Sequence, residues 1–125
     1  MQKKSFQLPC ADGHLMPMYA WLPDAPPVCI LHIAHGMAEY AERYAQVAEI
    51  FVQQGIAVYA HDQRAHGKAV ADLAGAGLGE DNWFYKQVDD IKIIIQYHRT
   101  TCPQQKVFLL GHSMGSFFSN AWQLN

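Results

Sequence analysis

The stretch from Val107 to Gly115 constrains the fold of this chain more than any other segment. Its first four residues, Val-Phe-Leu-Leu, are continuously apolar, which is typical of a strand buried in a parallel sheet. They lead directly into Gly-His-Ser-Met-Gly, and a helix-like stretch follows over residues 116–124. A strand, a Gly-x-Ser-x-Gly pattern and a helix in this order indicate a nucleophile elbow, a sharp turn that exposes a serine hydroxyl at its apex.

Two glycines flank the serine of this predicted turn. Gly111 and Gly115 stand two residues to either side of Ser113. Such a turn strains the serine backbone and crowds its neighbours, and glycine relieves the crowding because it lacks a Cβ atom. The helix that follows would direct its free N–H groups toward whatever the serine attacks. We therefore expect Ser113 in a strained conformation, between a strand ending near Leu110 and a helix beginning near Met114.

The composition indicates one globular domain or part of one. Half of the 125 residues are hydrophobic and 16% are charged. The net charge of −2 lacks the basic footprint of a nucleic-acid-binding protein, and no apolar run reaches membrane-spanning length. Three cysteines without C-x-x-C spacing predict reduced thiols in a cytoplasmic protein, in preference to a disulfide or a metal site: Cys10, Cys29 and Cys102.

Strand-like and helix-like segments alternate along the chain. Asp12-Gly13 is a strong hairpin signal between strand-like runs at 5–9 and 15–22. Further strands are expected at 28–34, 56–60 and 107–110, and helices at 39–54 and from 81 or 82 to about 99. Because strands and helices alternate after the hairpin, we expect an α/β fold with a parallel sheet covered on both faces.

Each expected helix carries an apolar stripe at helical spacing. Gly55 is a natural stop for the first helix, whose stripe comprises Tyr44, Val47, Ala48 and Phe51. The stripe of the second helix comprises Phe84, Val88, Ile91 and Ile95. Asp89 and Asp90 lie off this second stripe, so we expect them to be solvated or paired locally, with no catalytic role.

Three motifs follow the predicted parallel strands. Residues 35–40 read His-Gly-Met-Ala-Glu-Tyr, with Arg-Tyr at 43–44, and residues 62–67 read Asp-Gln-Arg-Ala-His-Gly. Together with Gly-His-Ser-Met-Gly, they resemble the motifs H-G-x-x-E-H…R-Y, D-x-R-G-H-G-x-S and G-H-S-M-G of the α/β-hydrolase superfamily. Within it, the chain looks most like the monoacylglycerol lipase and lysophospholipase group of serine hydrolases. It departs from that pattern at Tyr40, Ala65 and Ala69, where the group has histidine, glycine and serine.

The motif and the resemblance together assign candidate site residues. Ser113 is the nucleophile by motif, and the backbone N–H of Met114 is one expected oxyanion donor. The resemblance places the second donor at the backbone N–H of Met37. It also implies ester hydrolysis through an acyl-enzyme, on a small acyl ester or a lipid such as a monoacylglycerol or a lysophospholipid. No metal or organic cofactor is implied. Asp62 and Arg64 are expected to brace their loop as a pair.

A serine nucleophile needs a base to accept its proton. For His35, His66 and His112 we favour a hydrogen bond to nearby loop backbone over that role. In this fold the triad runs serine, acid, histidine along the chain, and residues 114–125 contain no Asp, Glu or His. We therefore interpret residues 1–125 as the N-terminal part of a single hydrolase domain, truncated after the elbow, without its cap and C-terminal half. The competing interpretation is a complete small enzyme with His35 as base.

The resemblance also predicts the sheet. The superfamily strand order is 1-2-4-3-5-6-7-8, so this chain supplies the first five strands and strand 107–110 lies at an open edge. Such an apolar edge promotes association, and we expect the isolated chain to aggregate or fold only in part, and to be nearly inactive. A peptidase, thioesterase or acyltransferase on the same fold, and a non-catalytic binding module, remain alternatives. Oligomeric state and peripheral membrane contact stay open.

Overall fold

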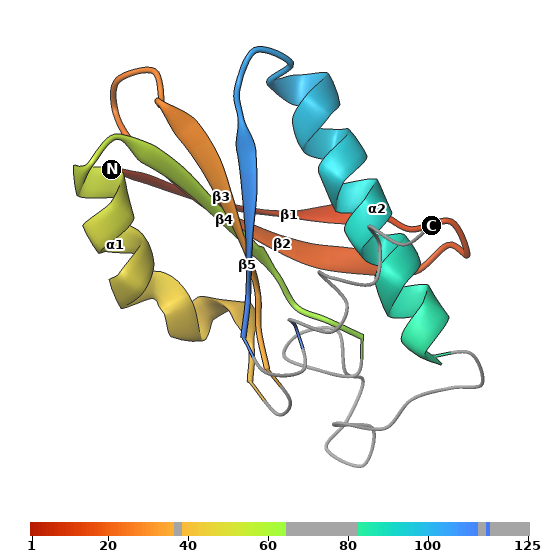
Figure 1. Cartoon of the computed structure of the whole chain (residues 1–125). Coiled ribbons are helices and arrows are strands. Elements are labelled where there is room, and N and C mark those ends of the chain that lie inside the picture. Colours follow the sequence, from red (N-terminus) through yellow and green to blue (C-terminus); the bar gives the residue numbers. More distant parts are fainter. Residues whose placement is uncertain (37–38, 65–82, 113–114, 116–125) are drawn as a thin grey trace.

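The computed structural model describes residues 1–36, 39–64, 83–112 and 115, and within them one five-stranded sheet, two α-helices and a 3₁₀ helix (Figure 1). In chain order these elements are β1 (Gln2–Pro9), β2 (Leu15–Leu22), β3 (Cys29–Ala34), η1 (Ala41–Tyr44), α1 (Ala45–Gln53), β4 (Ile56–His61), α2 (Trp83–Thr101) and β5 (Val107–Gly111). The strand order is β1-β2-β4-β3-β5, as predicted. The sheet is parallel from β4 through β3 to β5, and antiparallel from β1 through β2 to β4.

The predicted hairpin joins β1 to β2. Gly13 has a φ of 88°, a left-handed conformation that glycine adopts without steric cost. The turn is closed by the Cys10 N–H, which donates to the His14 carbonyl at 2.8 Å, and by the Gly13 N–H, which donates to the Cys10 carbonyl at 3.1 Å. The Asp-Gly signal therefore identified the hairpin, although β1 begins at Gln2, earlier than the predicted residue 5.

The helices α1 and α2 lie on opposite faces of the sheet (Figure 1). Successive side chains of a strand point to opposite faces, so β2 supplies both cores. Met16 and Met18 pack with Ile91 and Ile94 of α2. On the other face the packed residues include Tyr19, Trp21, Ala48 and Val52. The prediction of a sheet covered on both faces is confirmed.

The edge strand β5 is covered on one face only. Val107 and Leu109 pack against the core beneath α2, whereas Phe108 and Leu110 on the other face are 53% and 42% exposed. The helix α1 lies on that second face, toward the other strands of the sheet. Among the described residues, β5 therefore forms the predicted open edge of the sheet, with apolar side chains exposed along it.

The prediction of a single helix over residues 39–54 is wrong for the first third of that range. Tyr40 is extended, with a φ of −155°, and residues 41–44 form a 3₁₀ helix before α1 begins at Ala45. The Ala41 N–H donates to the Asp62 carboxylate at 2.8 Å, so a contact with the loop after β4 fixes the start of this segment. Val47, expected on the apolar stripe, is exposed, while Gly55 ends the helix with a φ of 84°.

The second helix matches its prediction closely. It runs to Thr101, two residues beyond the expected end, and its stripe residues Val88, Ile91 and Ile95 are buried. The side chain of Phe84 and the predicted N-cap at 81 or 82 lie outside the described residues. The same face continues to His98, which is also fully buried.

Candidate active site

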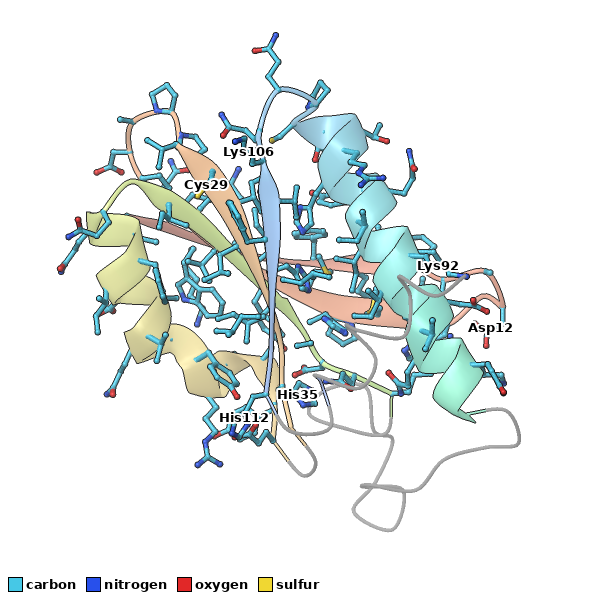
Figure 2. The ribbon with its side chains drawn as sticks, viewed as in Figure 1. Asp12, Cys29, His35, Lys92, Lys106 and His112 are labelled. Atoms are coloured by element: carbon cyan, nitrogen blue, oxygen red, sulfur yellow. The ribbon has the colours of Figure 1, made fainter. Side chains whose placement is uncertain are left out.

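The strands β3 and β5 end side by side. Ala34 is paired with Gly111 across the parallel ladder, and the His112 N–H continues it by donating to the Ala34 carbonyl at 3.0 Å. Figure 2 shows His35 and His112 together at this end of the sheet, opposite the end that carries Cys29 and Lys106. The segments that follow the two strands therefore leave the sheet from one place, which is where ligands bind in parallel α/β sheets.

Gly115 lies against the end of β3 and has no space for a side chain. A Cβ atom there would lie 2.6 Å from both the carbonyl carbon of Ala34 and the carbonyl oxygen of His35. Its N–H donates to the His112 carbonyl at 3.0 Å, an i to i+3 contact typical of tight turns. This explains the second glycine of the Gly-x-Ser-x-Gly pattern by a close backbone approach.

A carboxylate joins the two segments at this edge. Glu39 Oε1 accepts hydrogen bonds from the Gly36 N–H at 2.6 Å, the Tyr44 hydroxyl at 2.9 Å and His112 Nδ1 at 3.0 Å. Its second oxygen lies 3.6 Å from Nε of Arg43. We call these five residues, Gly36, Glu39, Arg43, Tyr44 and His112, the edge cluster. Burial opposes ionisation of Glu39, but the hydrogen bonds from Gly36, His112 and Tyr44 outweigh it and lower its pKa to about 2.

His35 is buried and both of its ring nitrogens are engaged. Nδ1 donates to the Gly36 carbonyl at 2.8 Å, and Nε2 accepts the Gln63 N–H at 2.9 Å. The predicted backbone-bonded role is confirmed for His35, and this bonding leaves neither nitrogen to act as a base. For His112 the prediction is wrong, because its partner is the Glu39 carboxylate. His66 lies outside the described residues.

Asp62 and Arg64 brace the loop after β4 through contacts with other elements of the fold. Asp62 accepts hydrogen bonds from the Tyr19 hydroxyl at 3.0 Å and from the Ala41 N–H at 2.8 Å. Arg64 binds Asp90 through Nε at 2.7 Å, and Asp12 of the hairpin at 2.9 Å. The guanidinium lowers the pKa of Asp12 below its usual range through these hydrogen bonds.

Asp90 corrects a second expectation. Its side chain is buried, and its partner Arg64 lies 26 residues away, so it is neither solvated nor paired locally. Asp89 is exposed, as predicted, with Lys92 at 3.9 Å. The contacts of Asp62 and Arg64 join the loop after β4 to the hairpin, to η1 and to α2.

Comparison with known proteins places this geometry in a family. A family model described as "Serine aminopeptidase, S33" matches residues 25–125. The chain belongs to that family. Its fold is the α/β-hydrolase fold: a carboxyl esterase from Bacillus coagulans, solved with glycerol, superposes with a TM-score of 0.83 at 25% identity, over 98% of this chain and 40% of the esterase.

Curated proteins similar to this chain include ones named lipases. A monoglyceride lipase homolog of Monkeypox virus is 36% identical over 99 residues, which are 79% of this chain and 34% of the relative. A monoacylglycerol lipase of Mycolicibacterium smegmatis is 35% identical over 95 residues, 76% of this chain and 32% of the relative. The chain thus spans about a third of the length of these curated relatives.

The three predicted catalytic positions, Ser113, Met114 and Met37, lie outside the described residues. Their immediate neighbours are described. Gly36 precedes Met37, and His112 and Gly115 enclose Ser113 and Met114. These neighbours meet at the ends of β3 and β5, through the edge cluster and the close approach of Gly115 to Ala34.

A second group of polar residues lies on the face beneath α2. His32 Nδ1 is 3.0 Å from Nε2 of His98, and His32 Nε2 is 2.9 Å from Nδ1 of His61. We call His32, His61 and His98 the histidine chain. All three are fully buried. Burial, and then the neighbouring histidines, lower the pKa of His32 well below its ordinary value. Burial is also the largest cause at the other two histidines, and it lowers the pKa of His61 to about 3 and that of His98 to about 4.

The sequence reasoning missed Glu39 and the histidine chain. Glu39 was part of a recognised motif, but its contact with His112 joins residues 73 positions apart. His32 interrupts an otherwise apolar strand, and His98 lies four residues after Ile94 on the buried face of α2. A histidine in each of these apolar settings was the available signal of buried partners.

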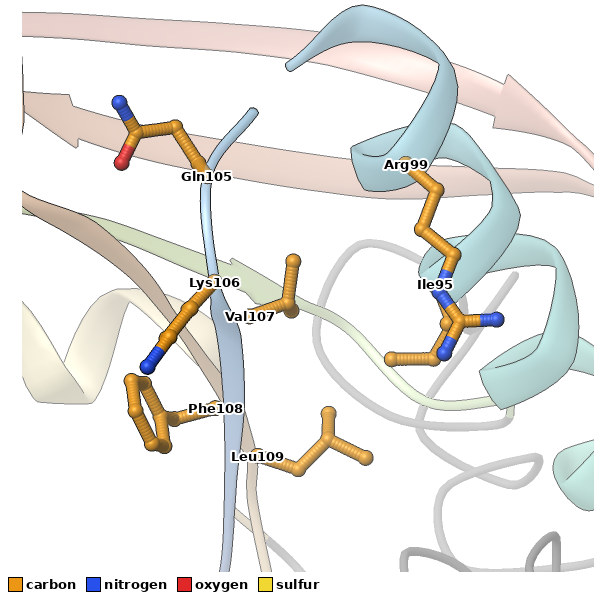
Figure 3. A pocket seen from close by; sticks show the side chains of 7 residues that line it. All are labelled: Ile95, Arg99, Gln105, Lys106, Val107, Phe108 and Leu109. Carbon is orange, nitrogen blue, oxygen red and sulfur yellow. The ribbon is translucent and has the colours of Figure 1, made fainter. Parts of the chain in front are cut away.

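A hollow of about 510 Å³ lies between α2 and β5 (Figure 3). It is lined by Ile95, Arg99, Gln105, Lys106, Val107, Phe108 and Leu109. Its lining extends along β5 as far as Leu109 and includes none of the residues at the strand end that leads to Ser113. We therefore do not assign it to the candidate active site.

Among the described residues, no three or more His, Cys, Asp or Glu side chains are grouped as metal ligands, and the nitrogen pairs of the histidine chain lie at hydrogen-bond distance. None of the helices within the described ranges combines the length and the apolarity needed to cross a bilayer.

Proposed function

We propose that the protein carrying this chain is a serine hydrolase that cleaves carboxylic esters through an acyl-enzyme on Ser113. The observation that carries the proposal is the common end of β3 and β5, where Ala34 pairs with Gly111 and Gly115 packs on the end of β3. In this arrangement the N–H groups of Met37 and Met114 would stabilise the oxyanion beside the serine.

The proposed substrate is a monoacylglycerol or a lysophospholipid-like ester. Support comes from the curated relatives that are named monoglyceride lipases, at 35–36% identity over about three quarters of this chain. A relative named lysophospholipase L2, from Escherichia coli, is 32% identical over 90 residues. The glycerol in the similar esterase structure is a further parallel.

We propose that the catalytic acid and the catalytic histidine lie outside residues 1–125. We infer that residues 1–125 form the N-terminal part of one hydrolase domain, because the chain spans about a third of its curated relatives. Within the described residues both ring nitrogens of His35 are engaged, which favours a base elsewhere. All three cysteines are free thiols, which supports a reducing compartment such as the cytoplasm.

The test is turnover by the protein expressed from its complete open reading frame. We expect hydrolysis of a long-chain monoacylglycerol or of lysophosphatidylcholine, and a loss of about 10⁴-fold or more in Ser113→Ala. The family description favours one competing activity, an aminopeptidase, so an aminoacyl nitroanilide is assayed in parallel. A higher kcat/KM on that substrate would replace the lipase assignment. Absence of Ser113-dependent turnover on either substrate would favour a non-catalytic binding module.

A further inference from the structure

The edge cluster connects the two segments that the proposed chemistry requires. Gly36 immediately precedes Met37, and His112 immediately precedes Ser113. The Gly36 N–H and the His112 ring are hydrogen-bonded to the same oxygen, Oε1 of Glu39, at 2.6 and 3.0 Å. One carboxylate oxygen thus spans the gap between the loop after β3 and the residue after β5.

The contact is tightly packed. A Cβ atom at Gly36 would lie 2.8 Å from Oε1 of Glu39 and 3.2 Å from the carbonyl oxygen of His112. The Glu39 side chain is only 13% exposed, whereas the side chain of His112 is 63% exposed. The carboxylate therefore occupies a fixed place between two backbone segments, and an exposed histidine closes over it.

The charge state of Glu39 suits this contact. Burial alone would favour the neutral acid, yet the hydrogen bonds from Gly36, His112 and Tyr44 hold its pKa at about 2. At neutral pH the group is a carboxylate, which accepts from all its neighbours at once and gives stronger hydrogen bonds than a neutral acceptor. A protonated acid or an amide would offer fewer acceptor sites to the same three donors.

We propose that Glu39 is a positioning residue that holds the Gly36 segment against the His112 segment, and so sets the Met37 N–H relative to the Ser113 hydroxyl. The inference rests on the proposed function. Glu39 touches no reacting atom in this account. It acts through Gly36 and His112, and its effect belongs to the transition state, in which the oxyanion must meet its donors at hydrogen-bond distance.

The test compares Glu39→Ala, Glu39→Gln and Tyr44→Phe in the protein expressed from its complete open reading frame. Glu39→Ala removes all the hydrogen bonds at once, and we expect kcat on a monoacylglycerol to fall about 100-fold with KM changed less than threefold. Tyr44→Phe removes one donor that lies on neither catalytic segment, and we expect its loss of kcat to be smaller than that of either Glu39 variant. Glu39→Gln keeps one acceptor oxygen for Gly36, so its kcat should be intermediate, about 10-fold below wild type.

Two further measurements separate the outcomes. Circular dichroism and the unfolding temperature show whether each variant is folded, and if Glu39→Ala is not folded, Glu39→Gln decides. A folded Glu39 variant with wild-type kcat, or one whose loss is entirely in KM, would overturn the positioning role while Ser113-dependent turnover of the wild type persists. A wild-type protein without Ser113-dependent turnover would overturn both the positioning role and the proposed function.

Discussion

The histidine chain begins with His32 on β3, and the edge cluster begins with Gly36, four residues later and just past the end of that strand; the two stabilise polar groups in opposite ways. In the edge cluster a carboxylate stays ionised, because several donors surround it and two of its partners, Arg43 and His112, reach solvent. In the histidine chain three rings stay neutral between the sheet and α2, because burial disfavours their charged forms. The carboxylate of Glu39 is thus ionised where the sheet meets water, and the three histidine rings are neutral within the core.

The contrast between the two regions indicates that they have different roles in the protein. The hydrogen bonds of the histidine chain run from His61 and His32 on the sheet to His98 on α2, so its role is stability. The edge cluster ties loop segments that precede Met37 and Ser113, so its role is geometry at the proposed site. The predictions below separate the two regions by substitution and by pH, in the protein expressed from its complete open reading frame.

The largest expected effect is the loss of the middle ring of the histidine chain. His32→Ala removes both hydrogen bonds, leaves His61 and His98 without their partner, and opens a cavity under α2. We expect the free energy of unfolding to fall by about 4 kcal/mol, measured by urea denaturation. His112→Ala is the matched histidine at the exposed edge and should cost less than about 1 kcal/mol. Equal costs for the two variants would contradict the comparison.

At the end of β3, we expect the close backbone approach of Gly115 to affect stability more than any charged contact does. Gly115→Ala places a Cβ atom against the backbone of Ala34 and His35, and neither can move without disturbing β3. We expect a loss of about 3 kcal/mol in the free energy of unfolding. Gly13→Ala serves as control, because a Cβ there meets nothing within 4 Å and only its φ of 88° is strained. Its cost should be about 1 kcal/mol. A Gly115→Ala variant as stable as the control would show that the close approach is relieved elsewhere.

The two regions should also respond to acid in different pH ranges. The histidines have folded-state pKa values below the ordinary 6.5, so the unfolded chain binds more protons, and stability is present above pH 6.5 and lost as pH falls toward 4 and 3. Between pH 6.5 and 5 each neutral histidine contributes a loss of about 1.5 kcal/mol. Glu39, lowered from 4.5 to about 2, contributes stability that is lost only below pH 4.5.

Urea denaturation at a series of pH values measures this difference. His98→Phe should reduce the loss between pH 6.5 and 5, and Glu39→Gln should leave it unchanged while reducing the loss below pH 4.5. A pH dependence above 5 that persists in full in His98→Phe would count against the neutral histidine chain.

The smallest effect is expected at the exposed rim of the edge cluster. Arg43 is largely in solvent, and its Nε lies 3.6 Å from Glu39. Arg43→Ala should change the free energy of unfolding by no more than about 0.5 kcal/mol, because water screens an exposed pair. Thermal unfolding at low and high salt measures it, and a loss above 1.5 kcal/mol would show that the arginine is needed to hold the carboxylate in place.

The fold was largely predictable because it depends on local patterns. Apolar runs located the strands, Asp12-Gly13 located the hairpin, and the family resemblance supplied the strand order that the sheet shows. The start of the first helix was not predictable in this way, because Ala41 is held by Asp62, a residue from the loop after β4. Periodicity cannot register such a contact.

The location of the candidate site could be predicted from the sequence, but most of its side-chain contacts could not. The motifs located the two segments that meet at the ends of β3 and β5. The carboxylate between them was not deduced, since the Glu39–His112 contact exists only once β5 pairs with β3. The prediction for Asp90 failed for a similar reason. Its position off the apolar stripe indicated solvent or a local partner, but its side chain binds Arg64 from the loop after β4.

The central claim is that the segments after β3 and β5 form one catalytic edge around Ser113. The most direct test treats the protein from the complete open reading frame with a fluorophosphonate probe, which reacts with serines activated beside an oxyanion site, and maps the adduct by peptide mass spectrometry. The account predicts one modified residue, Ser113, with labelling lost in Ser113→Ala and strongly slowed in Glu39→Ala. A folded protein that stays unlabelled, or carries the probe on another serine, would contradict it.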